Sequence, residues 1–429
     1  MYREASHFAR ILNPDKQKNR SPLLIDMWGL SENSCMTDLQ RVFELWRELE
    51  AEGADYVLAT VVAVEGPSYR KPGACMLLAQ DGRRAGTVSG GCLEAEVARR
   101  AWWHTADGPS IQHYSTVEED GDRPYGSGCG GVVWLLLERR PTAVPLLNSL
   151  EQAFQRRVPI AVATILEGEQ MGRRSLADLG SGQMVDPAFA VSDPLQSIAE
   201  AALASGGHAE TKLSHDGAEV RVWTDFRPAR PGLWIFGAGN DARPLVELGK
   251  ALGWYVTVAD GRSQLATPER FASADETHVL PVGEMPAIKS AGKPSVLANL
   301  RSQDAAVVMS HSFEQDSRAL ASLLALDVGP AYIGVLGPQR RTRELLAEAA
   351  RLLHLSADSN FSNSAWVERR LAELHAPTGL DLGAESPETI ALSVVAEIQK
   401  SQTGATGLPL SEVRGAAQAI SRKASLKPN

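Results

Sequence analysis

The spacing of apolar residues predicts a helix followed by strands in the first part of the chain. From Leu39 to Leu49, apolar side chains recur three and four positions apart, as on one face of an amphipathic helix. We expect this helix to begin directly after Met36, with Thr37 as its N-cap. Short apolar runs then predict strands, and a second helix is expected near 93–103. The predicted strands are 56–64, 74–80 and 131–138.

A second α/β run, from 145 to 226, repeats part of the first. The segment LATVVAVEG at 58–66 resembles VATILEGEQ at 162–170. Each segment is followed by basic residues and then by a turn that contains Gly. We interpret the two runs as degenerate copies of one unit within a single domain, of which the second copy lacks the cysteines of the first.

The pattern changes after RPARPG at 227–232, which predicts a linker because two prolines and a glycine interrupt any regular element. Short apolar runs then alternate with helical segments, as in a parallel, doubly wound sheet. The last helix, over 386–399, begins with Ser386 as N-cap and Pro387 at its first position. The prediction is an α/β protein in which a mixed α/β domain precedes a Rossmann-like domain. The expected boundaries are a tail at 1–35, domains at 36–228 and 232–402, and a second tail at 403–429.

Composition excludes several classes of protein. The 43 Lys and Arg against 52 Asp and Glu give a formal net charge of −9, which argues against non-specific binding to nucleic acid. Four cysteines are too few for a disulfide scaffold, and two four-cysteine iron–sulfur clusters would need about eight thiolates. The sequence offers no run of about 18 apolar residues and no signal peptide, so we expect a cytoplasmic protein without a membrane span.

The segment that opens the second domain has the pattern of a dinucleotide-binding loop. A strand leads into G-x-G-x-x-A, in which Gly237 permits a tight turn, Gly239 a close phosphate approach and Ala242 close helix packing. About 20 residues later the next strand ends in Asp260, where an acid can accept from a ribose hydroxyl. Arg262 is either a phosphate ligand or a solvated loop charge. The alternative is a Rossmann-like scaffold that holds another nucleotide or none.

Three loops of the first domain carry candidate chemistry. In the loop 66–74, the fork of Arg70 can hold a phosphate or carboxylate. The second loop has the conformation expected of an anion-binding loop and comes directly before a helix. The N-terminus of that helix would lower the pKa of the loop's thiol. It comprises Ser89, Gly90, Gly91 and Cys92. The third loop surrounds a second thiol with glycines, at Gly128, Cys129 and Gly130. We predict functional roles for Cys92 and Cys129. For Cys35 in the tail and Cys75 in a strand we predict no role in function.

Further candidates lie at the ends of later predicted strands, where open α/β sheets bind ligands. His311 is either a base or ligand contact or a structural loop residue. Gly337 and Arg340 offer an anion site at a helix start. The loop 375–384 is expected to close over the same crevice. No zinc site is expected, because neither Cys92 nor Cys129 belongs to a C-x-x-C pair.

With these motifs in this order, the chain resembles the XdhC/CoxI family of accessory proteins for xanthine dehydrogenase and carbon monoxide dehydrogenase maturation. The likeness covers about 40–140 and 232–400. It is carried by the loop at 66–74, by S-G-G-C-x-E at 89–94, by G-C-G-G at 128–131, and by the motifs at 260–262, 332–337 and 375–384. Asn240 stands where family members usually have a histidine, and Pro67 where they have a serine.

The resemblance implies a chaperone that binds molybdenum cofactor (molybdopterin), supports its sulfuration by a cysteine desulfurase and delivers it to an apo molybdenum hydroxylase. We expect a homodimer. The alternative is an NAD(P)-dependent oxidoreductase that uses the Rossmann domain, although no catalytic Tyr-x-x-x-Lys is evident. A molybdenum hydroxylase in its own right is opposed by the cysteine count. A binding module with a degenerate site is the fourth interpretation.

Overall fold

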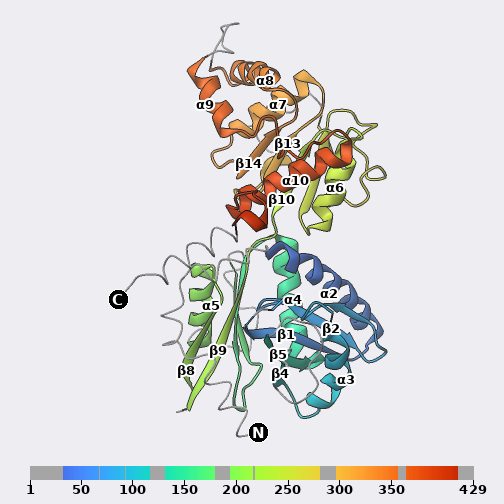
Figure 1. Cartoon of the computed structure of the whole chain (residues 1–429), viewed down its shortest axis with the longest axis vertical. Helices are drawn as coiled ribbons and strands as arrows, with labels where there is room; N and C mark the ends of the chain where they lie inside the picture. The colour runs from blue at the N-terminus through green and yellow to red at the C-terminus, as the bar shows by residue number, and fades with distance from the viewer. Residues whose placement is uncertain are drawn as a thin grey trace. The chain divides into compact units, whose positions relative to one another are not determined.

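The chain falls into two compact units that divide between Arg230 and Pro231, and each is described by itself (Figure 1). This computed structural model describes residues 32–66, 68–91, 93–115, 131–178, 194–215, 218–280, 296–355 and 364–413. Both units are α/β, but the strands of the first pair antiparallel and those of the second pair parallel.

The first half of the N-terminal unit is a helix, three strands, a helix and two strands. The strands form an antiparallel sheet in the order β3-β2-β1-β5-β4. The elements are α2 (Glu32–Glu52), β1 (Tyr56–Glu65), β2 (Cys75–Ala79), β3 (Arg84–Gly86), α3 (Glu94–His104), β4 (Ser110–Ser115) and β5 (Val132–Arg139).

The predicted start of the first helix was wrong. α2 begins at Glu32, so Thr37 is not its N-cap and Cys35 lies in a helix rather than in a tail. No Gly or Pro occurs between Ser31 and Thr37. A formed helix therefore extends through this segment, because each added residue gains one backbone hydrogen bond without a new nucleation cost.

The second half of this unit repeats the topology of the first. Its order β7-β6-β9-β8 corresponds to β2-β1-β5-β4. Each half has a helix before its first strand and another before its last two strands. The shared topology supports the predicted duplication. The elements are α4 (Arg140–Arg156), β6 (Ile160–Ile165), β7 (Arg174–Asp178), α5 (Pro194–Ser205), β8 (Ala209–His215) and β9 (Ala218–Arg227).

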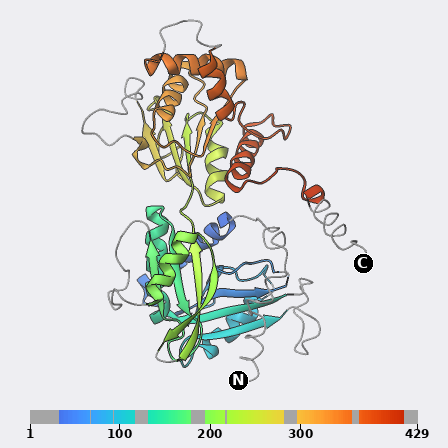
Figure 2. The same cartoon turned by 90° about the vertical axis from the view of Figure 1, so that its left-hand side faces the viewer.

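The two faces of each sheet pack against different helices. Alternate residues of β1 illustrate this, because Leu58 joins a core with α2 and α4, whereas Val57 and Ala59 join one with α3. The core around α2 and α4 includes Val162 of β6, so it spans both halves. α5 packs on the other face of the second sheet (Figures 1 and 2). α3 is thereby fixed on the first sheet, directly after the Ser-Gly-Gly segment.

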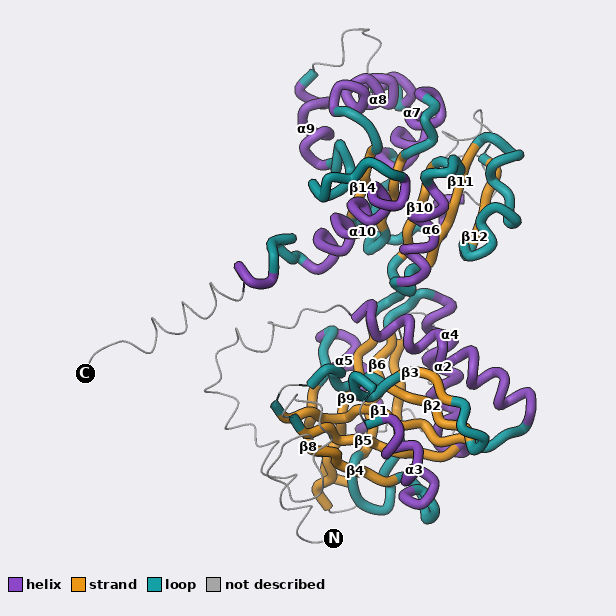
Figure 3. The backbone as a smooth tube through the Cα atoms, turned by 45° about the vertical axis from the view of Figure 1, so that its right-hand side comes forward, coloured by secondary structure: helices purple, strands orange, loops and turns teal. Residues whose placement is uncertain are grey.

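The second unit is the predicted doubly wound sheet. Its parallel strands follow the order β12-β11-β10-β13-β14 (Figure 3). Apolar side chains on one face pack with α6 and α10, and those on the other with α7, α8 and α9. The elements are β10 (Gly232–Phe236), α6 (Ala242–Ala251), β11 (Tyr255–Asp260), β12 (Glu276–Val279), the 3-10 helix η5 (Val296–Asn299), β13 (Ala305–Val308), α7 (Phe313–Leu324), β14 (Tyr332–Val335), α8 (Gln339–Leu352), α9 (Ala365–Glu373) and α10 (Pro387–Thr403).

The start of α10 confirms the capping prediction. The Ser386 hydroxyl accepts from the Thr389 N–H, the Thr389 hydroxyl accepts from the Ser386 N–H, and Pro387 is the first helical residue. The helix runs to Thr403 and ends at Gly404 in the left-handed conformation, a few residues beyond the predicted 386–399.

Candidate functional site

The hydroxyl of Ser89 organises the loop that leads into α3. It donates to Oε2 of Glu94 at 2.6 Å and accepts from the N–H groups of Gly91 at 3.2 Å and Leu93 at 3.1 Å. Oε1 of Glu94 accepts from the N–H groups of Val88 and Ser89. Ser89 was predicted to contact a cofactor, but its hydroxyl is used within the loop.

Glu94 is the residue of this site whose role sequence reasoning missed. It is only 5% exposed, although it begins a helix whose other first-turn acid, Glu96, pairs with surface arginines. Burial raises its pKa, but the hydrogen bonds from Ser89 and Val88 outweigh this and leave the pKa of Glu94 lowered. The carboxylate is therefore ionised near neutral pH and holds the loop. The signal was its place in S-G-G-C-x-E.

Cys92 lies outside the described residues, as do Cys129, Gly128 and Gly130 of the third predicted loop. The backbone on either side of position 92 is described, because Gly91 and Leu93 both donate to Ser89. Gly91 has φ +109, and a Cβ placed there would meet no atom within 4 Å. The loop therefore presents open backbone next to Cys92, in a conformation that favours glycine.

The loops 66–74 and 86–91 meet through one acid of α2. Asp38 pairs with Arg70 at 2.5 Å, and it accepts from the Thr87 hydroxyl at 3.3 Å. The Arg70 side chain is 15% exposed, so this pair holds the first loop against α2. Arg70 was predicted to hold a phosphate or a carboxylate, and the carboxylate that it holds here is that of Asp38 within the protein. At Gly90, a Cβ would lie 3.5 Å from Cγ of Tyr69, so the base of the Tyr69 side chain lies against the second loop.

Cys75 is a structural residue of the core, as predicted. It begins β2, is 6% exposed and carries a free thiol. A buried free cysteine behaves as a small apolar residue, and Cys75 packs in the core with α2 and α4.

The dinucleotide loop has the predicted backbone. Gly237 has φ +137, and a Cβ there would lie 2.7 Å from the carbonyl carbon and oxygen of Met309. Only glycine fits, because the loop passes directly against the end of β13. Ala242 is buried at the start of α6, whereas space is open around Gly239. This geometry permits close approach of a ligand to the backbone.

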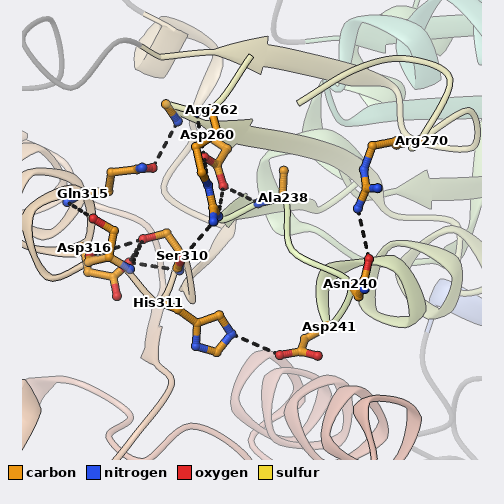
Figure 4. Close-up of polar contacts among 12 residues, drawn as sticks. Ala238, Asn240, Asp241, Asp260, Arg262, Arg270, Ser310, His311, Gln315 and Asp316 are labelled. Carbon is orange, nitrogen blue, oxygen red and sulfur yellow. Dashed lines mark hydrogen bonds and ion pairs between the residues drawn. The ribbon is translucent and has the colours of Figure 1, made fainter. Parts of the chain in front are cut away.

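Asp260 does not present a free carboxylate, which corrects its expected role toward a ribose. The residue is fully buried, and Oδ2 accepts from the Ala238 N–H at 2.7 Å and from Arg262 at 2.7 Å (Figure 4). Oδ1 accepts from the N–H and Nε of Arg262. Burial raises the pKa of Asp260, but these bonds outweigh it and the pKa is lowered. Asp260 thus fixes the dinucleotide loop and orients the side chain of Arg262, which also donates to the Ser310 carbonyl.

His311 reaches the dinucleotide loop from the end of β13. Its Nε2 lies 3.0 Å from Oδ2 of Asp241, directly before α6 (Figure 4). Its φ is +61, a left-handed conformation that non-glycine residues seldom adopt. The side chain is 60% exposed, so the His311–Asp241 pair faces solvent at the edge where such sheets bind ligands.

The two arginines at the next strand end take different partners within the protein. The Arg340 side chain is 91% exposed and pairs with Glu344 of its own helix. Arg341 donates to the buried Asp316 at 2.6 Å, and Asp316 accepts from the N–H and hydroxyl of Ser310. Gly337 has φ +111 in the turn before these arginines.

The loop 375–384 is tied to α10 by Glu397. This carboxylate accepts from the Tyr332 hydroxyl at 2.7 Å, the Gly379 N–H at 2.6 Å and His375 Nδ1 at 3.0 Å. A pocket beside it is lined by His375, Glu397, Lys400, Ser401, Gly404 and Ala405.

The described part of the chain contains no group of three His, Cys, Asp or Glu placed to hold a metal, and none of its helices is long and apolar enough to cross a bilayer.

Comparison with known proteins matches both units to one family. Residues 49–115 match the XdhC and CoxI family, and residues 233–398 match the XdhC Rossmann domain. A probable xanthine dehydrogenase subunit of Bacillus subtilis is 30% identical over 80% of this chain and 92% of its own length. The "Molybdenum cofactor insertion chaperone PaoD" of Escherichia coli is 25% identical over 86% of this chain and 91% of its own.

A solved structure has the same fold. It is described as a xanthine dehydrogenase from Bacillus halodurans, and it is 26% identical with a TM-score of 0.61 over 84% of this chain and 95% of that one. The residues matched by the two family models include the Ser-Gly-Gly segment and the dinucleotide loop. The chain belongs to the XdhC and CoxI family.

Proposed function

We propose that this protein is a maturation chaperone that binds molybdenum cofactor, supports its sulfuration and inserts it into a xanthine dehydrogenase-type hydroxylase. The observation that carries the proposal is the Ser89–Glu94 pair. A buried carboxylate and a hydroxyl are both used to fix the backbone on either side of Cys92. Hydrogen bonds that fix the backbone in this way are expected where a thiol must contact a ligand in a defined position.

The chemistry of these residues fits the cofactor as cargo. Open backbone at Gly91 leaves room for a ligand, and a thiolate is a soft donor suited to sulfur or molybdenum. The cofactor supplies the molybdenum centre that the client enzyme uses. Within this chain, Ser89 and Glu94 position the loop, and Cys92 is proposed to contact the cargo or carry its sulfur.

The cysteine count separates this proposal from dehydrogenase activity of the chain itself. Two relatives carry the name xanthine dehydrogenase, but this chain has four cysteines, and Cys75 is buried in a core. An electron relay of two four-cysteine clusters would need about eight. The relative described as an insertion chaperone aligns over most of the chain and supports the accessory role.

The proposal includes three partners in the cytoplasm, namely an apo molybdenum hydroxylase, a cysteine desulfurase and a second copy of this chain. The Rossmann unit is proposed to hold a phosphate-bearing part of the cargo or a nucleotide. Only the Rossmann fold supports the NAD(P)-dependent oxidoreductase alternative, since Asp260 is engaged within the protein.

Anaerobic gel filtration with molybdenum cofactor released from a donor molybdoenzyme tests the proposal, with oxidised-pterin fluorescence measured in the protein peak. We expect cofactor to elute with the wild-type chain and to be lost with Cys92→Ala or Cys129→Ala. Cys75→Ala is the matched control for removal of a thiol, and it should retain the cofactor. Wild-type protein that elutes without pterin at saturating cofactor contradicts the proposal.

A further inference from the structure

Tyr69 is an exposed aromatic residue held at the edge of the Ser-Gly-Gly loop. It is 73% exposed although its ring is large and largely apolar. The base of its side chain lies against Gly90, where a Cβ would lie 3.5 Å from Cγ of Tyr69. The guanidinium of Arg70 lies over the ring, 5.5 Å from its centroid.

The residues that hold this ring are themselves fixed. Arg70 pairs with Asp38 of α2 at 2.5 Å, and the Asp38 carboxylate also accepts from Thr87, which precedes the Ser-Gly-Gly segment. Gly90 lies between Ser89, which Glu94 anchors, and Gly91, which donates to Ser89. The residues that contact Tyr69 are therefore fixed by hydrogen bonds and an ion pair, while most of the Tyr69 side chain is exposed to solvent.

Such a surface suits a flat ligand. An aromatic ring on a supported loop can stack against a planar heterocycle without first losing much conformational freedom. The neighbouring cation adds attraction for a polar or anionic ring system. The support from Gly90 distinguishes Tyr69 from Trp103 of α3, which is 75% exposed and contacts the next side chain of its own helix, His104.

We propose that Tyr69 is the stacking platform for the pterin ring of the molybdenum cofactor, next to the Ser-Gly-Gly segment. This inference rests on the proposed function and adds to it a residue outside the thiol loops. The pterin ring would stack on the solvent-exposed part of the Tyr69 ring, and the open space at Gly91 would be available to the rest of the ligand. Tyr69 contributes binding through its ring, and its hydroxyl is not required.

The test compares Tyr69→Ala, Tyr69→Phe and Trp103→Ala in the full chain by anaerobic titration with molybdenum cofactor from a donor enzyme, with bound pterin measured by fluorescence after filtration. Loss of one stacking contact corresponds to a roughly fivefold to tenfold weaker Kd. We expect this weakening for Tyr69→Ala, wild-type binding for Tyr69→Phe, and wild-type binding for the Trp103→Ala control. Thermal unfolding should be unchanged in all three, because both side chains are exposed.

The outcomes separate this inference from the proposed function. If wild type binds cofactor and Tyr69→Ala binds it equally well, the stacking platform is overturned while the proposed function stands. If wild type binds no cofactor, both fail. A parallel titration with NAD⁺ tests the other planar heterocycle, and Tyr69-dependent binding of NAD⁺ without such dependence for the cofactor would overturn the assignment to pterin.

Discussion

The hydroxyl oxygen of Ser89 lies 2.6 Å from Oε2 of Glu94 and accepts from the backbone amides of Gly91 and Leu93. Three polar groups of one loop thus bond to a single oxygen. Two of these amides flank the cysteine that the proposed function requires. These hydrogen bonds fix the conformation of a glycine-rich segment that would be flexible without them.

We expect Ser89→Ala to lower the free energy of unfolding by about 2–3 kcal/mol, because it leaves a buried carboxylate and two amides short of a partner. Urea unfolding measures the change. Ser205→Ala is the control, because the exposed Ser205 hydroxyl bonds only the Ala202 carbonyl, and its effect should stay within about 0.5 kcal/mol. Equal effects of the two variants would show that the loop does not depend on Ser89.

Substitution of Gly91 should separate backbone strain from ligand contact. Gly91 has φ +109 and Gly108 has φ +127, and a Cβ at either position would meet no atom within 4 Å. Each alanine variant should therefore lose about 1–3 kcal/mol of stability from the same kind of strain. Only Gly91→Ala should also reduce cofactor binding in the gel-filtration experiment. A Gly91→Ala protein that binds as wild type would argue against the open backbone as a contact surface.

Asp241 should weaken the binding of any dinucleotide to the loop at 237–242. Phosphates bound there approach the first amides of α6, where the Asp241 carboxylate lies 32% exposed beside His311. Asp241→Asn removes this charge while keeping the side-chain shape, and we expect threefold to tenfold tighter binding, as for loss of about 1 kcal/mol of repulsion. Calorimetric titration of both proteins with NAD⁺ and NADP⁺ measures the change in affinity.

The control for this charge change is Asp327→Asn, an exposed acid after α7. It alters the net charge equally and should leave nucleotide affinity unchanged. Nucleotide affinity that does not increase in Asp241→Asn would contradict the prediction.

Glu397 should make the Rossmann unit sensitive to acid. Burial raises its pKa, but the bonds from Tyr332, Gly379 and His375 outweigh this and leave the pKa lowered from 4.5. A carboxylate with a lower pKa in the folded state contributes stability above its unfolded pKa and loses that contribution as the pH falls through its folded pKa. Urea-unfolding midpoints should therefore decline below about pH 4.5.

Glu397→Gln should unfold at lower urea than wild type at pH 7 and show a flatter decline toward pH 3, since its amide does not titrate. Glu247→Gln, an exposed change on α6, should keep the wild-type profile. A Glu397→Gln protein with the full acid-dependent decline would show that other groups cause it.

The sequence by itself determined the features that depend on neighbouring residues along the chain. Alternating apolar runs specified the parallel sheet, the glycine pattern specified the turn at Gly237, and Ser386 with Pro387 specified the start of α10. Each depends on backbone dihedral angles or on side-chain spacing within one or two turns. The start of α2 was missed because Thr37 has the residue type of an N-cap, whereas the helix continues upstream to Glu32.

Only the tertiary structure decided which partners the polar side chains take. Asp260, Arg70 and Ser89 have the residue types expected of ligand contacts, yet Arg262, Asp38 and Glu94 engage them within the protein. Sequence spacing does not fix such pairings. Arg70 meets Asp38 only because the fold brings its loop to α2, and a buried charge takes whichever donor lies within hydrogen-bonding distance. The tertiary structure also placed Tyr69 beside Gly90, a proximity that no sequence spacing predicts because the two loops meet only in the folded chain.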